Sequence, residues 1–222
     1  MASAFDHDTY VCLDLPSSVA EQVLAIRRAQ RDEFRAALPA EITVAGSSGV
    51  GPIAPDQDPQ EAFARLDAIA AQTPPIEASF RDVVRFPNTD IFVLALKNQR
   101  PFRALHERIA TSGLRFKPTP FSDDTPHCTL RSRSPVTEEE AAELLALRIP
   151  EPFVIDTMSV YRLDKLPMTL LHRSRLTGTA EQETSSYQDG PPTVGPAGTS
   201  GNAAGGGERQ PQQAGRRGRQ ER

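Results

Sequence analysis

Hydrophobic and polar positions form short stretches of two kinds along residues 1–176. In one kind, apolar residues alternate with polar ones or form a brief apolar run, which is typical of strands. In the other, apolar residues recur every three or four positions behind a Pro, Ser or Thr, which is typical of helices. The pattern predicts strands at Tyr10–Leu15, Glu41–Ala45, Ile76–Phe86, Asp90–Leu96, His127–Leu130, Phe153–Leu163 and Met168–Leu176, and helices at 17–38, 59–72, 101–111 and 137–147.

The predicted elements run twice through one order: strand, helix, short strand, helix, long strand. The two short strands begin at Glu41 and His127, and each follows a turn that contains a proline. A repeat of this size predicts two similar lobes, about 1–87 and about 88–176, related by a pseudo-twofold axis. We therefore expect an α/β (α+β) fold with antiparallel-rich sheets around a central groove.

Composition changes sharply after Leu176. Residues 177–222 contain ten of the fourteen glycines and no Ile, Leu, Met or Phe. Such a segment buries too little apolar surface to offset the entropy lost on ordering, so we expect a disordered tail. Its last fifteen residues include five arginines. An end of this composition either binds RNA weakly or only keeps the protein in solution.

Charge, hydropathy and cysteine content exclude several classes of protein. The formal net charge of −4 argues against a protein that wraps duplex DNA. The sequence has neither a long apolar run that predicts a transmembrane helix nor a secretory signal pattern. The two cysteines build no disulfide framework, and no His, Cys or Asp spacing suits a metal ion. We expect a cytoplasmic monomer without a bound metal.

The second short strand, with the sequence HCTL, carries the residues best suited to chemistry. Strand residues i and i+2 project to one face, so His127 and Thr129 lie together, and Arg131 joins them if the strand continues. The first short strand, EITV, places Glu41 beside Thr43 in the same way. A shift of one residue in register would instead turn Glu41 outward. With a twofold axis, the two pairs converge on one groove.

The stretch HCTL, after a proline and before an arginine, resembles the H-x-[ST]-x signature of the 2H phosphoesterase superfamily. That superfamily includes bacterial 2′-5′ RNA ligase-like proteins and RNA 2′,3′-cyclic phosphodiesterases. The resemblance covers roughly residues 8–176 through the opening strand and the duplicated order of elements. It implies a duplicated two-lobe fold, chemistry at an RNA terminus or a small nucleotide, and no cofactor. The chain departs from the pattern at Glu41, where the family's first motif has a histidine.

The resemblance implies a role for each motif residue. His127 is the expected general acid or base, Thr43 and Thr129 the expected phosphate ligands, and Arg131 an expected partner for substrate charge. Two roles are open for Glu41, which replaces the family's histidine: the expected general base opposite His127, or the expected acid if its site keeps it protonated. An ionised Glu41 also repels a phosphodiester, by about 4 kcal/mol at 4 Å and an effective dielectric constant of 20.

Other functions remain open beside that of an RNA 2′,3′-cyclic phosphodiesterase or 2′-5′ RNA ligase-like enzyme. With Glu41 in the place of histidine, the chain is alternatively a nucleotide or RNA-end binding module without turnover. A second alternative is a protein–protein adaptor that uses the groove and the arginine-rich tail. His172 is a candidate substitute for the missing imidazole, although a strand histidine is more often only partly exposed. The glycine-rich stretch 46–51 lacks the Lys and Ser/Thr of a P-loop.

Overall fold

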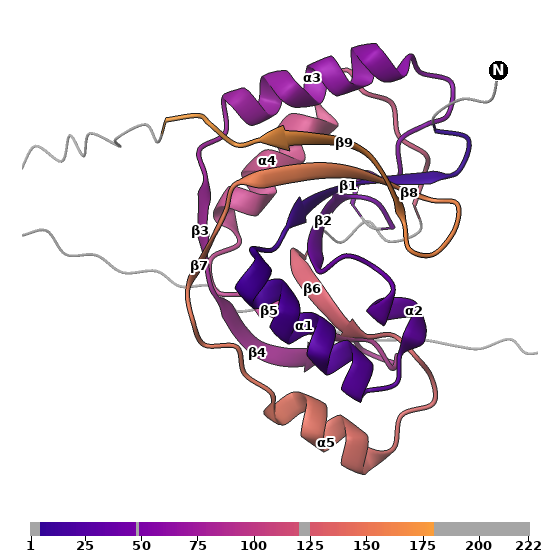
Figure 1. Cartoon of the computed structure of the whole chain (residues 1–222), viewed down its shortest axis with the longest axis vertical. Coiled ribbons are helices and arrows are strands. Elements are labelled where there is room, and N and C mark those ends of the chain that lie inside the picture. The colour runs from indigo at the N-terminus through magenta and orange to yellow at the C-terminus, as the bar shows by residue number, and fades with distance from the viewer. Residues whose placement is uncertain (1–4, 48, 120–124, 180–222) are drawn as a thin grey trace, which may run out of the picture. The chain divides into compact units, whose positions relative to one another are not determined.

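Strands and helices alternate along the described part of the chain, residues 5–47, 49–119 and 125–179 of a computed structural model (Figure 1). In chain order they are β1 (Asp8–Asp14), α1 (Ser17–Ala29), α2 (Glu33–Ala36), β2 (Glu41–Ala45), α3 (Pro59–Ala71), β3 (Ile76–Ala78), β4 (Phe80–Arg85), β5 (Phe92–Leu96), α4 (Arg100–Ala110), β6 (His127–Arg131), α5 (Glu138–Ala146), β7 (Phe153–Ile155), β8 (Thr157–Leu163) and β9 (Thr169–Arg175).

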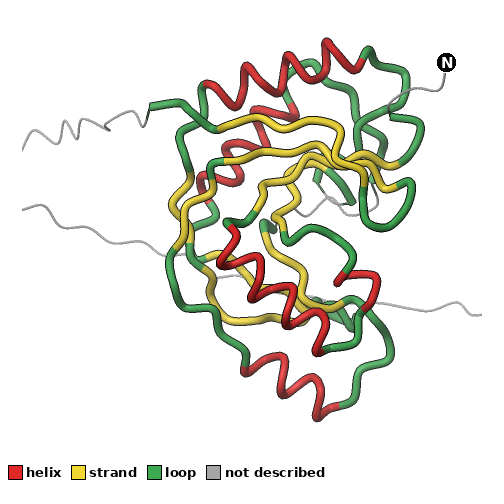
Figure 2. The backbone as a smooth tube through the Cα atoms, viewed as in Figure 1, coloured by secondary structure: helices red, strands yellow, loops and turns green. Residues whose placement is uncertain are grey.

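The strands pair into three sheets, and every pairing between neighbouring strands is antiparallel. The first sheet has the order β2-β1-β8-β9, and the second has the order β4-β5-β6. A third sheet consists only of β3 and β7. Figure 2 shows the helices around these sheets. The prediction of a mixed fold with antiparallel-rich sheets is confirmed.

The lobes exchange strands, so the predicted division into about 1–87 and about 88–176 is wrong. The first sheet takes β8 and β9 from the second half of the chain, and the second sheet takes β4 from the first half. Both long predicted strands are interrupted, which makes this exchange feasible. Their first parts, β3 and β7, pair with each other, and their second parts, β4 and β8, then enter the opposite sheets.

Helices cover one face of each large sheet (Figure 1). α3 lies against β9, α4 against α3 and β2, α1 against β6, and α5 against β4. The covered faces are apolar, with Leu13 and Ile42 fully buried in the first sheet and Leu94 and Leu130 fully buried in the second. Side chains alternate along a strand, so the neighbouring polar residues project from the opposite faces. None of the described helices is long and apolar enough to cross a bilayer.

The helix predicted at 17–38 is two helices, because the chain breaks at Arg31. Arg31 has a φ of +54°, a backbone conformation that ends a helix at a non-glycine residue. Asp32 then starts α2 by accepting a hydrogen bond from the Arg35 backbone N–H at 3.0 Å. The same carboxylate accepts from the N–H groups of Ser132 at 2.7 Å and Arg133 at 3.0 Å, directly after β6. Burial opposes ionisation of Asp32, but these hydrogen bonds outweigh it and lower its pKa.

The chain beyond β9 stays attached to α3 for a few residues. The N–H of Thr177 donates to the carbonyl of Ala70 at 3.2 Å, and the N–H of Gly178 donates to the carbonyl of Thr73 at 2.9 Å. The predicted start of disorder at residue 177 is therefore wrong for these two residues. Residues 180–222, on which the rest of that prediction rests, lie outside the described residues.

Candidate functional site

The two motif strands are edge strands of different sheets, and they lie side by side. β2 ends the order of the first sheet, β6 ends that of the second, and residues of the two strands are in contact. The backbone of Glu41 hydrogen-bonds to the thiol of Cys128 across the junction. Burial raises the pKa of that thiol to about 11, so Cys128 stays protonated at neutral pH and is no nucleophile.

Arg27 of α1 joins the two motif strands from the inside. Its side chain is fully buried, and its Nε donates to the carbonyl of Thr129 in β6 at 3.0 Å. Its Nη1 donates to the carbonyls of Leu38 at 3.1 Å and Pro39 at 3.0 Å, in the turn that leads into β2. The residue was not predicted. It occupies the same helical stripe as Val19 and Val23, so an arginine in an apolar stripe was the available signal.

His127 is half-buried, and its ring is held on two sides. Its Nδ1 lies 2.5 Å from the carbonyl oxygen of Thr125, and its ring contacts Phe86 edge-on with centroids 5.1 Å apart. A carbonyl only accepts hydrogen bonds, so Nδ1 carries a proton. Nε2 is therefore the ring nitrogen whose protonation changes, as a general acid or base requires.

Glu41 and Thr43 project to one face of β2, as strand alternation predicts. The Thr43 hydroxyl donates to Glu41 Oε2 at 3.0 Å, and both residues are half-buried. Cys12, the neighbour of Thr43 on β1, hydrogen-bonds to the same carboxylate. Burial, with the nearby Glu41 charge, raises the pKa of the Cys12 thiol well above its usual value. The carboxylate therefore has two donors at rest.

A second acidic group lies beside Glu41 on the first sheet. Asp14 of β1 is the direct strand partner of Glu41. Its carboxylate accepts from Ser159 Oγ at 2.7 Å and Tyr161 Oη at 2.9 Å, and Arg173 Nη2 is 3.4 Å away. Burial and the Asp14 charge raise the pKa of Tyr161 to about 12, so its hydroxyl stays a donor. These contacts fix Asp14 within its own sheet.

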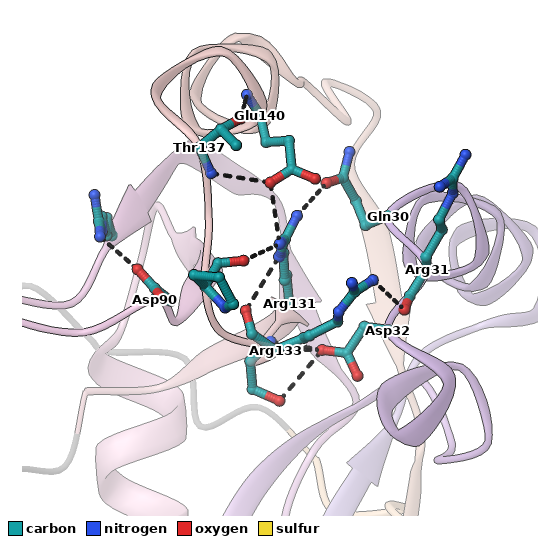
Figure 3. Close-up of polar contacts among 11 residues, drawn as sticks. Gln30, Arg31, Asp32, Asp90, Arg131, Arg133, Thr137 and Glu140 are labelled. Atoms are coloured by element: carbon teal, nitrogen blue, oxygen red, sulfur yellow. Dashed lines mark hydrogen bonds and ion pairs between the residues drawn. The ribbon is translucent and has the colours of Figure 1, made fainter.

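Arg131 does not join His127 and Thr129 as a substrate ligand. Its side chain is fully buried, and Figure 3 shows its guanidinium among Gln30, Glu140 and the loop after β6. It donates to Gln30 Oε1 at 3.1 Å, to the Pro135 carbonyl at 2.9 Å and to Glu140 Oε2 at 3.3 Å.

A bulge in β6 explains this displacement. Phe92 and Val93 are consecutive on β5, but their partners on β6, Arg131 and Thr129, are two positions apart, so β6 has one extra residue here. A bulge of this kind changes the direction of the side chains that follow it. Alternation alone therefore gave the correct strand but the wrong surroundings for Arg131.

Arg35 of α2 is a cation near Glu41 that the sequence did not single out. Burial lowers the pKa of Arg35, and the charge of Glu41 is the strongest electrostatic influence that opposes this shift. Its Nε donates to Ser132 Oγ at 2.9 Å, and its guanidinium lies 5.6 Å from the Phe34 ring centroid. In the predicted continuous helix 17–38, nothing distinguished this arginine from its neighbours.

His172 does not replace the missing imidazole. Its Nε2 lies 2.8 Å from Asp67 Oδ1 of α3, and its ring stacks on Phe63 with centroids 4.5 Å apart. It therefore belongs to the helix-covered face of the first sheet, opposite the face of Glu41 and Thr43. Among residues 5–47, 49–119 and 125–179, no group of three His, Cys, Asp or Glu side chains is arranged to hold a metal ion.

Comparisons with known proteins identify the family and the fold of this chain. The family model described as the 2′-5′ RNA ligase superfamily matches residues 15–166. The crystal structure of TT0787 of Thermus thermophilus is similar with a TM-score of 0.54 and 16% identity, over 78% of this chain and 100% of that chain. E. coli LigT complexed with 3′-AMP has a TM-score of 0.47 and 19% identity, over 77% and 98%. No curated protein matches the sequence.

Proposed function

Because this chain belongs to the 2′-5′ RNA ligase superfamily, we propose that it carries out metal-independent phosphoester chemistry at RNA ends or on small nucleotides. One arrangement carries the proposal. A His-x-Thr strand and a Glu-x-Thr strand lie at neighbouring sheet edges, with His127 and Glu41 at the first position of each. One residue of each strand thus has a group that exchanges protons, and the next residue on the same face has a hydroxyl.

The proposed reaction opens a 2′,3′-cyclic phosphate. Glu41 takes the proton of the attacking oxygen while the new bond to phosphorus forms. Nε2–H of protonated His127 donates its proton to the ribose oxygen whose bond to phosphorus breaks. If the attacking oxygen is water, the product is a phosphomonoester. If it is the 5′-hydroxyl of a second RNA and the 3′-oxygen leaves, the product is a 2′-5′ linkage. Exchange with solvent then restores both groups.

The order of these roles follows from the surroundings of the two groups. The Thr125 carbonyl fixes a proton on Nδ1 of His127, so a second proton on Nε2 makes the imidazolium that a leaving oxygen needs. Glu41 accepts hydrogen bonds from Thr43 and Cys12, so its carboxylate oxygens already act as acceptors, as the group that takes up a proton requires. A carboxylate base and an imidazolium acid are therefore the consistent assignment.

Charge at the phosphorus is the main difficulty, and Arg35 is the residue we assign to it. An ionised Glu41 repels a phosphodiester. Arg131 does not offset this repulsion, because its guanidinium is hydrogen-bonded to Gln30 and Glu140. The Arg35 guanidinium interacts electrostatically with Glu41 and is planar, with several donors suited to phosphate oxygens. Thr43 then turns its hydroxyl from Glu41 to the phosphate when substrate binds, since one hydroxyl donates only once.

Turnover of a defined substrate tests the proposal. The purified protein is incubated in EDTA with an RNA oligomer that ends in a 2′,3′-cyclic phosphate and with cyclic mononucleotides. Removal of a general acid or base lowers rates by about 10²–10⁴-fold, so His127→Ala and Glu41→Gln are both expected to lose at least 100-fold in kcat. The exposed residue Glu33 provides the control Glu33→Gln, which should keep the native rate.

Glu41→His separates the remaining interpretations. A variant that matches or exceeds the native rate shows that Glu41 occupies the acid–base position of the first motif. Activity that appears only in Glu41→His means that the natural chain binds its ligand without turnover. Absence of turnover in the native protein and in every variant would refute the proposed chemistry and leave only the fold.

Nucleotide binding without turnover is the second candidate, and the resting contacts of Glu41 favour it. The Thr43 hydroxyl donates to Glu41, so this carboxylate has a structural partner on its own strand, which a binding module without a general base would also have. A binding module predicts a higher unfolding temperature with a 2′- or 3′-nucleotide and no conversion of a cyclic phosphate. If neither binding nor conversion is detected, the remaining interpretation is a protein–protein adaptor.

A further inference from the structure

We propose that a cationic pocket at the outer edge of the second sheet binds backbone phosphates of single-stranded RNA, upstream of the end that reacts. This inference rests on the proposed function, because it extends the same substrate away from His127. The pocket has a volume of about 440 Å³ and lies between β4, the end of β5 and the segment after α5. Its charged residues are Arg81, Asp82, Lys97 and Arg148.

The charge of this pocket is positive and largely uncompensated. Arg148 Nε is 3.1 Å from Asp82 Oδ1, so this acid and this base neutralise each other. Among the described residues, neither Arg81 nor Lys97 has an ion pair, and both side chains are exposed. Two cations therefore remain for an anionic ligand. Isolated surface cations are ordinary, but two that line one pocket attract a ligand with repeated negative charge.

The register of the second sheet connects this pocket to the candidate site. His127 is paired with Ala95 on β5, and Lys97 is two residues farther along the same strand. Leu96 is in turn paired with Phe80 on β4, directly before Arg81, and the N–H of Lys97 donates to the Ser79 carbonyl at 2.9 Å. His127 and the pocket thus share one end of the sheet.

The separation suits a chain of nucleotides. Neighbouring strands are about 4.8 Å apart, so β4 lies about 10 Å from β6 across β5. An RNA chain whose terminal phosphate lies at His127 reaches this edge with the nucleotides next to its end. The pocket also has an apolar side, formed by Ile149 and Pro150, which a ribose or base can contact. A single phosphate ion would use the cations but not this apolar side.

RNA length separates this pocket from the reacting site. Binding is measured by fluorescence anisotropy with 5′-labelled RNAs of two, four and eight nucleotides that end in a 2′,3′-cyclic phosphate. Native protein is compared with Arg81→Ser, Lys97→Ser and the double variant. Arg103→Ser is the matched control, because Arg103 is an exposed arginine of α4 outside this pocket. Circular dichroism confirms that each variant is folded.

The double variant should bind the octamer roughly 10- to 30-fold more weakly at 0.1 M monovalent salt. The slope of log K against log salt should fall by about 1.4, or about 0.7 for each lost single-strand phosphate contact. Lys97→Arg should bind the octamer with most of the native affinity. The control Arg103→Ser should bind the octamer as tightly as the native protein. Turnover of cyclic mononucleotides should be the same in all of these variants.

Three results would overturn the proposal. One is octamer binding that is unchanged in the double variant. Another is an equal loss for dinucleotide and octamer, which would mean a general loss of surface charge. Competition by inorganic phosphate as effective as by RNA would also refute it, because the pocket would then be an anion site only. If the native protein turns over no substrate, the proposed chemistry fails, whereas the anisotropy comparison still decides whether the pocket binds RNA.

Discussion

Arg27 offers the sharpest test of how the two motif strands are held together. Replacement by methionine keeps a long side chain in the buried position but removes every donor. Four carbonyl oxygens accept from the guanidinium: that of Thr129 at 3.0 Å, that of Arg35 at 3.1 Å, and those of Leu38 and Pro39 in the turn before β2. All four lose this donor in Arg27→Met.

The expected cost follows from those contacts. A buried polar group left without its hydrogen bond costs about 1–3 kcal/mol, and some of these carbonyls can recruit water at the partly exposed turn. Methionine also removes a buried positive charge, and a buried cation without an acidic partner is itself unfavourable, so this change offsets part of the lost stability. We therefore expect Arg27→Met to lower the free energy of unfolding by about 3–5 kcal/mol.

Urea unfolding followed by circular dichroism measures this quantity. The neighbouring residue Arg28 is exposed on the same helix, so Arg28→Met controls for the general effect of exchanging an arginine and should change stability by less than about 0.5 kcal/mol. Arg27→Lys should recover only a small part of the loss, since an ammonium cannot reach both strands. A loss below about 1 kcal/mol in Arg27→Met would refute the view that this side chain joins β2 and β6.

The remaining predictions concern single contacts. Asp32→Ala removes a helix cap and leaves the N–H groups of Ser132 and Arg133 without their acceptor, so unfolding should be easier by about 2–4 kcal/mol in a denaturant titration. The pKa of Asp32 is lower in the folded state than in the unfolded chain. Ionised Asp32 therefore contributes its full stabilisation above the pKa of the unfolded chain, and this stabilisation is lost as pH falls through the pKa of the folded state. Asp32→Ala should accordingly show a smaller decrease in the free energy of unfolding at acidic pH than the native protein. Gly51→Ala should cost at least about 2 kcal/mol in thermal unfolding, because φ is +91° and a Cβ would lie 1.9 Å from the Lys117 carbonyl oxygen. Gly113→Ala, whose Cβ would meet only the end of the Arg65 side chain, should cost less. His172→Ala should leave turnover of a cyclic phosphate unchanged, and a loss above tenfold would place that ring in the site after all.

Local signals predicted the elements well but could not choose strand partners. Periodicity located the strands that begin near residues 76 and 153, yet it joined β3 with β4 and β7 with β8. A short interruption leaves the alternation of apolar residues almost intact, so it is invisible in the pattern. Which sheet a strand enters depends on contacts with residues far away in the chain, and the exchange of strands between the lobes arises there.

The two buried arginines show the same limit for the site. Alternation placed Arg131 on the strand of His127, but the β6 bulge and the acceptors of Gln30 and Glu140 decide where its guanidinium lies. Arg27 followed an apolar helical stripe and was overlooked because arginine is usually exposed. A long side chain reaches several elements, so its partner depends on the assembled fold rather than on its own strand or helix.

In the proposed reaction, the difference between the two motifs determines the direction of proton transfer. On the β6 side, the Thr125 carbonyl holds a proton on Nδ1 of His127, so Nε2 is the nitrogen that donates in the proposed reaction. On the β2 side, two carboxylates, Glu41 and Asp14, are strand partners, and Arg35 and Arg173 lie near them. Two imidazoles would let either strand take either role, whereas a carboxylate facing an imidazolium has one productive assignment. A phosphodiester therefore has to approach with its leaving oxygen toward β6 and its attacking group toward β2. The double variant Glu41→His with His127→Glu exchanges the two groups and would require the substrate to bind in the reverse orientation. The Thr125 carbonyl and Arg35 keep their places in this variant, so we expect it to fold like the native protein and to lose activity.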